Sequence, residues 1–165
     1  MPIPFLWIGA GAAIFAGVKV ADKRHSALTG AAVVPVDGAI VSCGIFGVFE
    51  HTGVWLDGNI IELKGNGLIR AISAARFLAQ RSGELISVAC NEKGEPLVAG
   101  QAAERAVSKL YQYSEYDVLK NNCHRFVWHC ISGSNEPLTR FSDLHKRLEK
   151  HFHCQVCWPK AELER

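Results

Sequence analysis

The sequence has no run of basic residues. Its 18 lysines and arginines nearly balance 16 aspartates and glutamates, so the formal net charge is only +2. Nucleic-acid-binding domains usually present a basic patch or stripe, so nucleic acid is not an expected partner. The cysteine pattern of a disulfide-bonded scaffold is also missing, because the six cysteines lie at irregular spacing in 165 residues. A chain of this length is expected to form about one domain with its own core.

Charged side chains are absent from residues 1–18, and a basic segment from Lys19 to His25 follows. As a helix this stretch would be about 27 Å long, close to the bilayer hydrocarbon thickness of about 30 Å. A secretory signal would carry positive charge before the apolar run. Positive charge after it favours an anchor with the domain on the cytoplasmic side. We therefore predict that residues 1–26 form an apolar helix that spans or docks on a membrane. Packing of this helix on its own domain or in a dimer is the alternative.

The rest of the chain predicts strands first and helices after. Turn signals in residues 27–38 indicate a connector into a domain that extends to residue 133. Strands are predicted over 39–63 and 84–90, and helices over 69–81, over 101–113, from Cys123 onward and over 139–152. This order indicates an α+β domain with an antiparallel sheet packed by helices. Residues 134–165 are predicted as a C-terminal amphipathic helix and tail.

Three of these helices have apolar residues at helical spacing, which predicts their core faces. These residues are Ala102, Ala106, Val107 and Leu110; Phe126, Val127, Cys130 and Ile131; and Phe141, Leu144, Leu148 and Phe152.

The run EHTGVWLDGNIIELKG, residues 50–65, predicts a hairpin. Asp57-Gly58 between two apolar runs is typical of a two-residue loop, because both central residues adopt positive φ. That loop fixes the register and places Glu62 opposite Gly53 and diagonal to His51. A carboxylate there can accept a hydrogen bond from one ring nitrogen and leave the other nitrogen to act as a base. A half-exposed hairpin with a polar outer face is the alternative interpretation.

The run LKNNCHRFVWHC, residues 119–130, places a cysteine at the start of a helix. Asn121 and Asn122 are favourable N-cap residues, so the helix is predicted to begin at or beside Cys123. A thiol in the first helical turn lies at the positive end of the helix dipole, which favours the nucleophilic thiolate. A buried thiol on a core helix is the alternative. The remaining cysteines of the domain, Cys43, Cys90 and Cys130, lack this context and are predicted to be buried and unreactive.

The runs EHTGVWLDGNIIEL and YDVLKNNCHRFV together resemble the lecithin:retinol acyltransferase family, a member of the NlpC-type permuted papain-like superfamily. The resemblance extends over about residues 34 to 132 and implies a circularly permuted papain-like fold. It also implies a triad with Cys123 as the nucleophile, His51 as the general base and Glu62 as the group that orients His51. No cofactor and no metal are expected. The sequence departs from the family pattern after the cysteine, where His124 and Arg125 replace glutamate and histidine.

A triad of this kind predicts a thiol-dependent acyltransferase or hydrolase that works through a thioester acyl-enzyme. The apolar residues 1–18 favour a lipid or acyl-chain substrate and a membrane-associated protein with its catalytic domain on the cytoplasmic side. One alternative is a cysteine peptidase or amidase of the NlpC type that cleaves peptide amides, which would require export. A non-catalytic interaction domain is the other alternative.

A Cys/His cluster, HFHCQVCWP, lies near the C-terminus. Cys154 and Cys157, with His151 and His153 nearby, have the residue types of a zinc site or of a redox pair. No second pair lies at zinc-finger spacing, and an ordinary tail is the preferred interpretation.

Overall fold

The computed structural model describes residues 31–46, 48–79, 81 and 85–163. The predicted apolar helix of residues 1–26 lies outside the described residues. Among the helices of the described part, none is long and apolar enough to cross a membrane.

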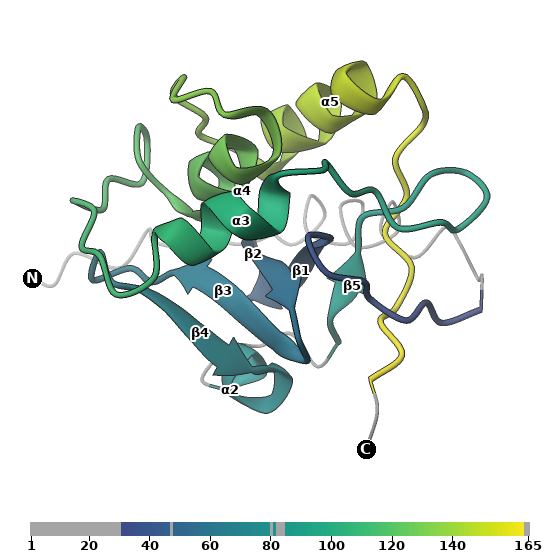
Figure 1. Ribbon diagram of the computed structural model, residues 1–165, viewed down its shortest axis with the longest axis horizontal. Helices are drawn as coiled ribbons and strands as arrows, with labels where there is room; N and C mark the ends of the chain where they lie inside the picture. The colour runs from purple at the N-terminus through teal and green to yellow at the C-terminus, as the bar shows by residue number, and fades with distance from the viewer. Residues whose placement is uncertain (1–30, 47, 80, 82–84, 164–165) are drawn as a thin grey trace, which may run out of the picture.

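The domain is α+β, as predicted. Its five strands form one antiparallel sheet in the order β4-β3-β2-β1-β5 (Figure 1). The strands are β1 (Ile40–Ile45), β2 (Phe49–Leu56), β3 (Asn59–Leu63), β4 (Ile69–Ser73) and β5 (Ser87–Val88). The helices of the described part are α2 (Ala74–Leu78), α3 (Ala102–Ser108), α4 (Cys123–Ser132) and α5 (Phe141–Phe152).

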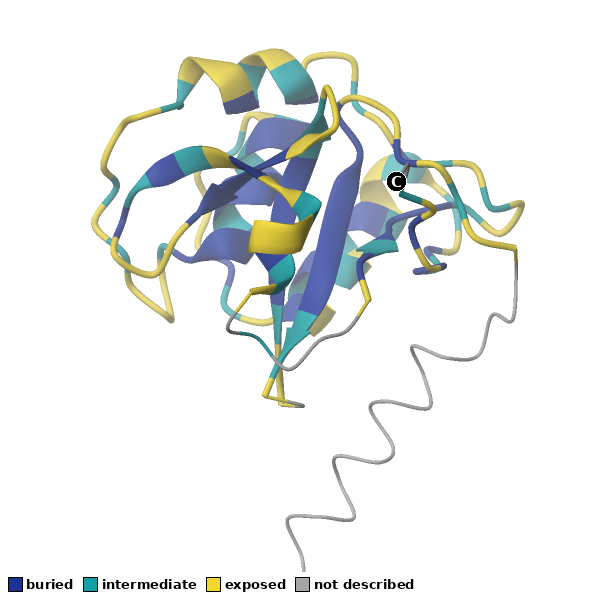
Figure 2. Cartoon of the chain, turned by 90° about the horizontal axis from the view of Figure 1, so that it is seen from below, coloured by how far each residue is buried: buried dark blue, intermediate teal, exposed yellow. Residues whose placement is uncertain are grey.

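Helices cover both faces of the sheet. Figure 1 shows α3, α4 and α5 gathered on one side, whereas α2 packs against β3 and β4 from the other. Successive residues of a strand point to opposite faces, and Ile60 and Ile61 accordingly belong to two different core clusters. The central strands are largely buried in Figure 2, and the last four residues of β3 are all buried. The polar face of the hairpin therefore lies inside the protein and not at its surface.

The predicted hairpin is confirmed. Asp57 and Gly58 form the turn with φ of 47° and 71°. The register joins Val54 to Ile61, Trp55 to Ile60 and Leu56 to Asn59. The local turn chemistry was therefore sufficient to set the pairing of β2 with β3.

The predicted helix over 69–81 is wrong in its first part. Residues Ile69–Ser73 form β4, and only Ala74–Leu78 form a helix. The alanines of this segment favour a helix locally, but the free edge of β3 pairs with the segment along its whole length. Pairing and burial against a neighbouring strand override local propensity. The correction matters for the site, because β4 places Arg70 directly opposite Glu62.

Two other elements are shorter than predicted. The strand expected over 84–90 is reduced to Ser87–Val88, and α3 ends at Ser108. Ala106 of α3 is buried, but Val107, predicted on the same face, is 45% exposed. Successive residues of a helix are turned by about 100°, so Val107 points away from the direction in which Ala106 is buried. The short helix α3 does not bury that second direction.

The last two helices follow their predicted apolar faces. The buried residues of α4 include all four predicted ones, and Leu144 and Leu148 of α5 are fully buried. Gly133 ends α4 in the left-handed conformation with φ of 74°, a conformation that favours glycine. Arg105 of α3 donates hydrogen bonds to the carbonyl groups of the last turn of α4. These contacts join the end of α4 to α3.

Candidate active site

His51 and Glu62 meet inside the domain, where the hairpin register predicts them. Nε2 of His51 lies 2.7 Å from Oε2 of Glu62. The two residues are 5% and 0% exposed, so water competes little for this hydrogen bond. Because Glu62 engages Nε2, Nδ1 is the ring nitrogen that is left to exchange a proton with another group.

Two arginines hold the Glu62 carboxylate. Arg70 donates from Nε and Nη2 to Oε1 at 2.9 and 2.8 Å, and Arg81 donates from Nη2 to Oε2 at 2.9 Å. Burial raises the pKa of Glu62, but the hydrogen bond and charge of His51, the hydrogen bond of Arg70 and the charge of Arg81 outweigh it and bring the pKa to about 2. Glu62 is therefore a fixed negative charge beside His51 at neutral pH. Sequence reasoning missed both arginines.

Phe77 of α2 forms the apolar support under this cluster. Its ring centroid lies 5.2 Å from that of His51, and the Arg81 guanidinium lies 4.9 Å from the Phe77 centroid in a cation–π contact. The side chain of Phe77 is fully buried. The short helix α2 thus fixes the position of His51 from the face of the sheet opposite α4.

Gly53 of β2 allows the close approach on which the site depends. A Cβ atom at Gly53 would lie 2.5 Å from Cγ2 of Ile60 and 2.9 Å from the carbonyl oxygen of Ile61. It would also lie 3.4 Å from the Phe77 ring. Only a residue without a side chain fits between β3 and α2 at this point.

Replacing Gly53 by alanine is expected to destabilise the domain by about 2 kcal/mol, because backbone and core atoms must move to admit the methyl group. Urea unfolding of wild type and Gly53→Ala measures the change. Gly65→Ala is the matched control, since a Cβ at Gly65 would meet no atom within 4 Å. Equal losses of stability in the two variants would contradict this explanation of Gly53.

Cys123 is the first residue of α4, as predicted. Asn122 is the N-cap, and its Oδ1 accepts a hydrogen bond from the backbone N–H of Arg125 at 3.0 Å. Its Nδ2 donates to the carbonyl groups of Val118 and Thr139 at 2.8 and 3.0 Å. Asn122 therefore ties the helix start to the preceding loop and to the segment before α5, which fixes the position of the thiol.

The Cys123 thiol lies against two imidazoles. Burial raises the pKa of Cys123, but hydrogen bonds to His124 and His51 and the charges of both rings lower the pKa well below its ordinary value. Burial lowers the pKa of His51, but its hydrogen bonds with Cys123 and Glu62 raise the pKa overall. Opposite shifts of this kind favour a thiolate beside an imidazolium. The structure thus brings the three sequence-predicted residues together, with a hydrogen bond between His51 and Glu62 and an electrostatic interaction between His51 and Cys123.

His124 is a second imidazole at the thiol, at one of the positions where the sequence departs from the family pattern. Its Nδ1 lies 3.8 Å from Sγ of Cys123 and 3.2 Å from Oγ1 of Thr52. The Phe141 ring of α5 contacts it edge-on, with centroids 5.8 Å apart. His124 is 7% exposed. It is a positioning neighbour of the thiol, and Glu62 is not among its hydrogen-bond partners in the described chain.

Tyr116 is a further site residue that sequence reasoning missed. Burial, the charge of Cys123 and a hydrogen bond to the Cys123 side chain raise the pKa of Tyr116 to about 12, although the Cys123 backbone N–H also donates to it. The phenolic oxygen therefore lies within reach of both Sγ and the backbone amide of Cys123. The loop before α4 folds back through paired backbone hydrogen bonds between Asp117 and Asn121, which brings Tyr116 to this place.

The other predicted thiols differ from Cys123 in their surroundings. Cys43, Cys90 and Cys130 are 3%, 0% and 0% exposed. Burial raises their pKa values to about 11, 12 and 12. All three are buried, as predicted, and raised pKa values of this kind favour the protonated thiol, which is the less reactive form.

The C-terminal Cys/His cluster is not assembled around a common point. In the described part of the chain, no three His, Cys, Asp or Glu side chains are grouped so that they could hold a metal ion. The Cys157 thiol donates to the carbonyl of Asn91 at 2.8 Å, and the His151 ring packs edge-on against Trp128. These two residues therefore have packing roles.

Comparison with known proteins adds no family assignment. The sequence matches no protein-family model and no curated protein.

Proposed function

We propose that the protein is a thiol acyltransferase or hydrolase with a permuted papain-like domain, in which Cys123 is the nucleophile. One observation carries the proposal: Nε2 of His51 lies 2.7 Å from Glu62, and interactions with His51 and His124 lower the pKa of the Cys123 thiol well below its ordinary value. A nucleophile, a base and a group that orients the base are the parts that acyl transfer through a covalent intermediate requires. A binding scaffold would have no need to stabilise a buried thiolate.

The proposed reaction has two steps. Sγ of Cys123 attacks the carbonyl carbon of an acyl ester, and the leaving alcohol takes a proton from the His51 imidazolium. His51, now neutral, then removes a proton from water or from an acceptor alcohol or amine, which attacks the thioester. The second attack releases the acyl product and restores the thiolate with the imidazolium. Glu62 remains ionised throughout, since its pKa is about 2, and it stabilises the imidazolium.

In this proposal the backbone N–H of Cys123 and the hydroxyl of Tyr116 form the oxyanion site. The side chain and the backbone of Cys123 both affect the pKa of Tyr116, so a substrate carbonyl oxygen that reached the Cys123 N–H and the Tyr116 hydroxyl would accept a hydrogen bond from each. Both donors belong to or contact the residue that attacks, which is the geometry that stabilises the negative oxygen of a tetrahedral intermediate. Tyr116 is the second donor that the sequence alone did not locate.

Tyr116→Phe is expected to lower kcat by about 100-fold, because one donor to the oxyanion is lost. KM and the unfolding midpoint should change little, since the ring keeps its packing. Steady-state kinetics on an ester substrate measures both parameters. A fall in kcat/KM that comes only from a higher KM would assign Tyr116 to substrate binding and contradict its role as a donor.

A lipid acyl ester is the substrate class that we propose. Phe46 and Phe49, at the turn between β1 and β2, are 72% and 65% exposed, and Val48 between them is 60% exposed. This apolar turn leads directly into the strand that carries His51. Exposed apolar residues at a loop tip suit a substrate that is presented at a lipid surface. The apolar residues 1–18 agree with a membrane-associated protein whose catalytic domain lies on the cytoplasmic side.

Intact mass measurement tests the proposal. Wild type and Cys123→Ala protein are incubated briefly with phosphatidylcholine vesicles, and the masses are compared. An added acyl mass on wild type, absent from the variant, is the expected result. An unmodified wild type whose Cys123 still alkylates quickly would move the substrate to peptide amides. An unmodified and unreactive Cys123 would leave a non-catalytic domain.

A further inference from the structure

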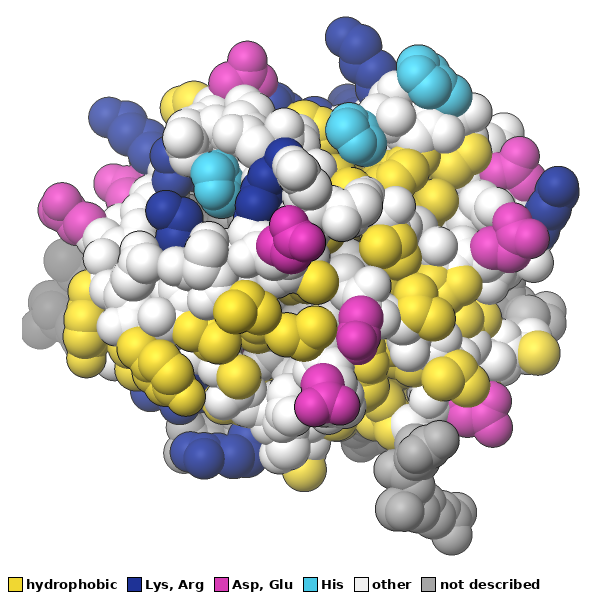
Figure 3. Space-filling view, in the orientation of Figure 1, with side chains coloured by type: hydrophobic (Ala, Val, Ile, Leu, Met, Phe, Trp, Pro, Cys, Tyr) yellow, Lys and Arg dark blue, Asp and Glu magenta, His cyan; other side chains and the backbone are white. Residues whose placement is uncertain are grey.

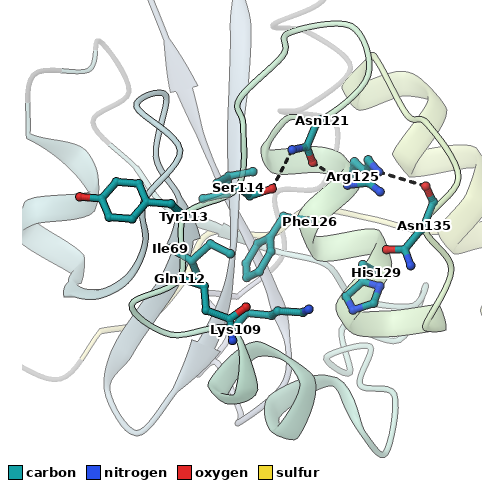
Figure 4. Close-up of a pocket in the computed structure, with 11 residues that line it drawn as sticks. Ile69, Lys109, Gln112, Tyr113, Ser114, Asn121, Arg125, Phe126, His129 and Asn135 are labelled. Carbon is teal, nitrogen blue, oxygen red and sulfur yellow. Dashed lines mark hydrogen bonds between the residues drawn. The ribbon is translucent and has the colours of Figure 1, made fainter.

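A hollow lies beside α4, and its charged lining residues have no role in the proposed reaction. It encloses about 250 Å³ and is lined by residues of β3, β4, the segment after α3, α4 with its preceding residue Asn121, and the loop after α4. The end of α3 and the following loop contribute Lys109 and Gln112, and α4 contributes Arg125 and His129. Figure 4 shows these side chains turned toward a common space, with Asn135 at its right edge.

The lining is positively charged and contains no carboxylate. Lys109, Arg125 and His129 are its basic residues, and the remaining lining residues are apolar or neutral and polar. The ion pairs of the described residues include neither Lys109 nor Arg125. In Figure 3 a histidine lies among lysine and arginine side chains at the upper left of the molecule, over α3 and α4. Positive groups that face one another without a counter-charge repel, so this arrangement costs stability unless an anion is present.

Arg125 is held in position by neutral groups. Its Nη1 donates to Oδ1 of Asn121, and its Nε donates to the carbonyl of Asn135 at 3.1 Å. Asn121 is fixed in turn by its hydrogen bond to Ser114 at 2.7 Å. The guanidinium is therefore oriented in advance but keeps its full charge, and its Nη2 group has no hydrogen-bond partner among the described residues. A preorganised cation of this kind suits the recognition of an oxyanion.

The positive charges that line the hollow act on His129. Burial and the positive charges of Lys109, Arg105 and Arg125 lower the pKa of His129, although a hydrogen bond with the Ser134 backbone raises it. Its Nδ1 atom is buried and has no hydrogen-bond partner among the described residues. Buried polar atoms without partners are rare and call for a specific cause. An anion in the hollow would provide a counter-charge for the positive groups around this ring.

We propose that this hollow binds a phosphate group, held by Lys109 and Arg125 with His129 as the third donor. Two cations, of which Arg125 is held by hydrogen bonds, match the charge of a phosphate near neutral pH, and the volume admits a phosphate with a small attached group. The phosphate has two possible sources, the headgroup of a lipid or a free soluble phosphate. The headgroup source rests on the proposed function, because α4 carries both Arg125 and Cys123 and would bring a lipid phosphate close to the thiol. The site itself does not depend on that function.

Titration of the full chain with inorganic phosphate and with glycerol 3-phosphate tests the proposal. Binding is measured by calorimetry, and the His129 ring is followed by NMR. Both ligands are expected to bind wild type and to raise the pKa of His129. Lys109→Gln should weaken binding by about tenfold, the effect of losing one hydrogen bond to a charged group. Lys146→Gln on the exposed face of α5 is the matched control and should bind like wild type.

A second variant distinguishes loss of phosphate binding at the site from loss of binding through misfolding. Lys109→Glu places a carboxylate among the cations, so it should abolish phosphate binding and raise the unfolding midpoint. Tighter binding of glycerol 3-phosphate than of inorganic phosphate would identify the lipid headgroup as the source. Tighter binding of inorganic phosphate would identify a soluble phosphate as the source. Absence of binding to wild type, or equal binding by Lys109→Gln, would refute the site. Cys123→Ala protein should bind phosphate normally, which separates failure of this site from failure of the acyl-transfer proposal.

Discussion

Cys123→Ala protein is expected to lose acyl transfer by at least about 10⁴-fold, because no other group at the site can form the covalent intermediate. Cys43, Cys90 and Cys130 cannot substitute for it, since burial keeps their thiols protonated. Hydrolysis or transfer of a phosphatidylcholine acyl chain, followed by product release, measures the loss.

Folding should survive this substitution. The thiol of Cys123 makes no hydrogen bond that holds the helix start, since Asn122 performs the capping. Thermal unfolding of Cys123→Ala is the control and should give a midpoint close to that of wild type. A folded Cys123→Ala protein that turns over substrate at the wild-type rate would remove Cys123 from the reaction.

Glu62→Gln is expected to destabilise the domain by about 3 kcal/mol, because it leaves Arg70, Arg81 and His51 around a buried site without a negative charge. The side chains of Arg70 and Arg81 are 23% and 15% exposed, so water solvates their charges in part. Activity should also fall, because His51 loses the charge that raises its pKa. His51→Ala should be slower still, since it removes the base itself. Wild-type stability and activity in Glu62→Gln would separate Glu62 from both roles.

The same carboxylate predicts a pH dependence of stability. The pKa of Glu62 is lowered from an ordinary value of 4.5 to about 2 in the folded protein. A lowered pKa contributes stability that is complete above about pH 4.5 and is lost as the pH falls toward 2, in total about 3 kcal/mol. Urea unfolding at a series of pH values measures this slope. It should be much flatter in Glu62→Gln, and an equal slope in both proteins would assign the acid sensitivity to other carboxylates.

The parts of the site that depend on local chemistry could be predicted from the sequence. A two-residue turn at Asp57-Gly58 sets the register, so the meeting of His51 with Glu62 follows from one hairpin. Likewise, Asn122 caps a helix that begins at the next residue. Each of these predictions needed fewer than about 16 consecutive residues and no knowledge of the rest of the fold.

The parts that depend on long-range pairing could not be predicted. Arg70 reaches Glu62 only because an alanine-rich segment joins the sheet edge as β4 and does not form a helix. Arg81 follows α2, whose position depends on that strand. Tyr116 reaches Cys123 only because its loop folds back on itself between Asp117 and Asn121. In each case tertiary contacts decide between local conformations of similar free energy.

The pH dependence of Cys123 alkylation tests the central claim most directly. Wild type is treated with iodoacetamide over about pH 5 to pH 9, and mass spectrometry of peptides reports the rate at each cysteine. We predict that Cys123 reacts with a midpoint well below the ordinary thiol value of 9.0, and that His51→Ala moves this midpoint upward. A Cys123 that reacts only as the pH approaches 9.0, or that reacts no faster than Cys43, would contradict the thiolate and the mechanism built on it.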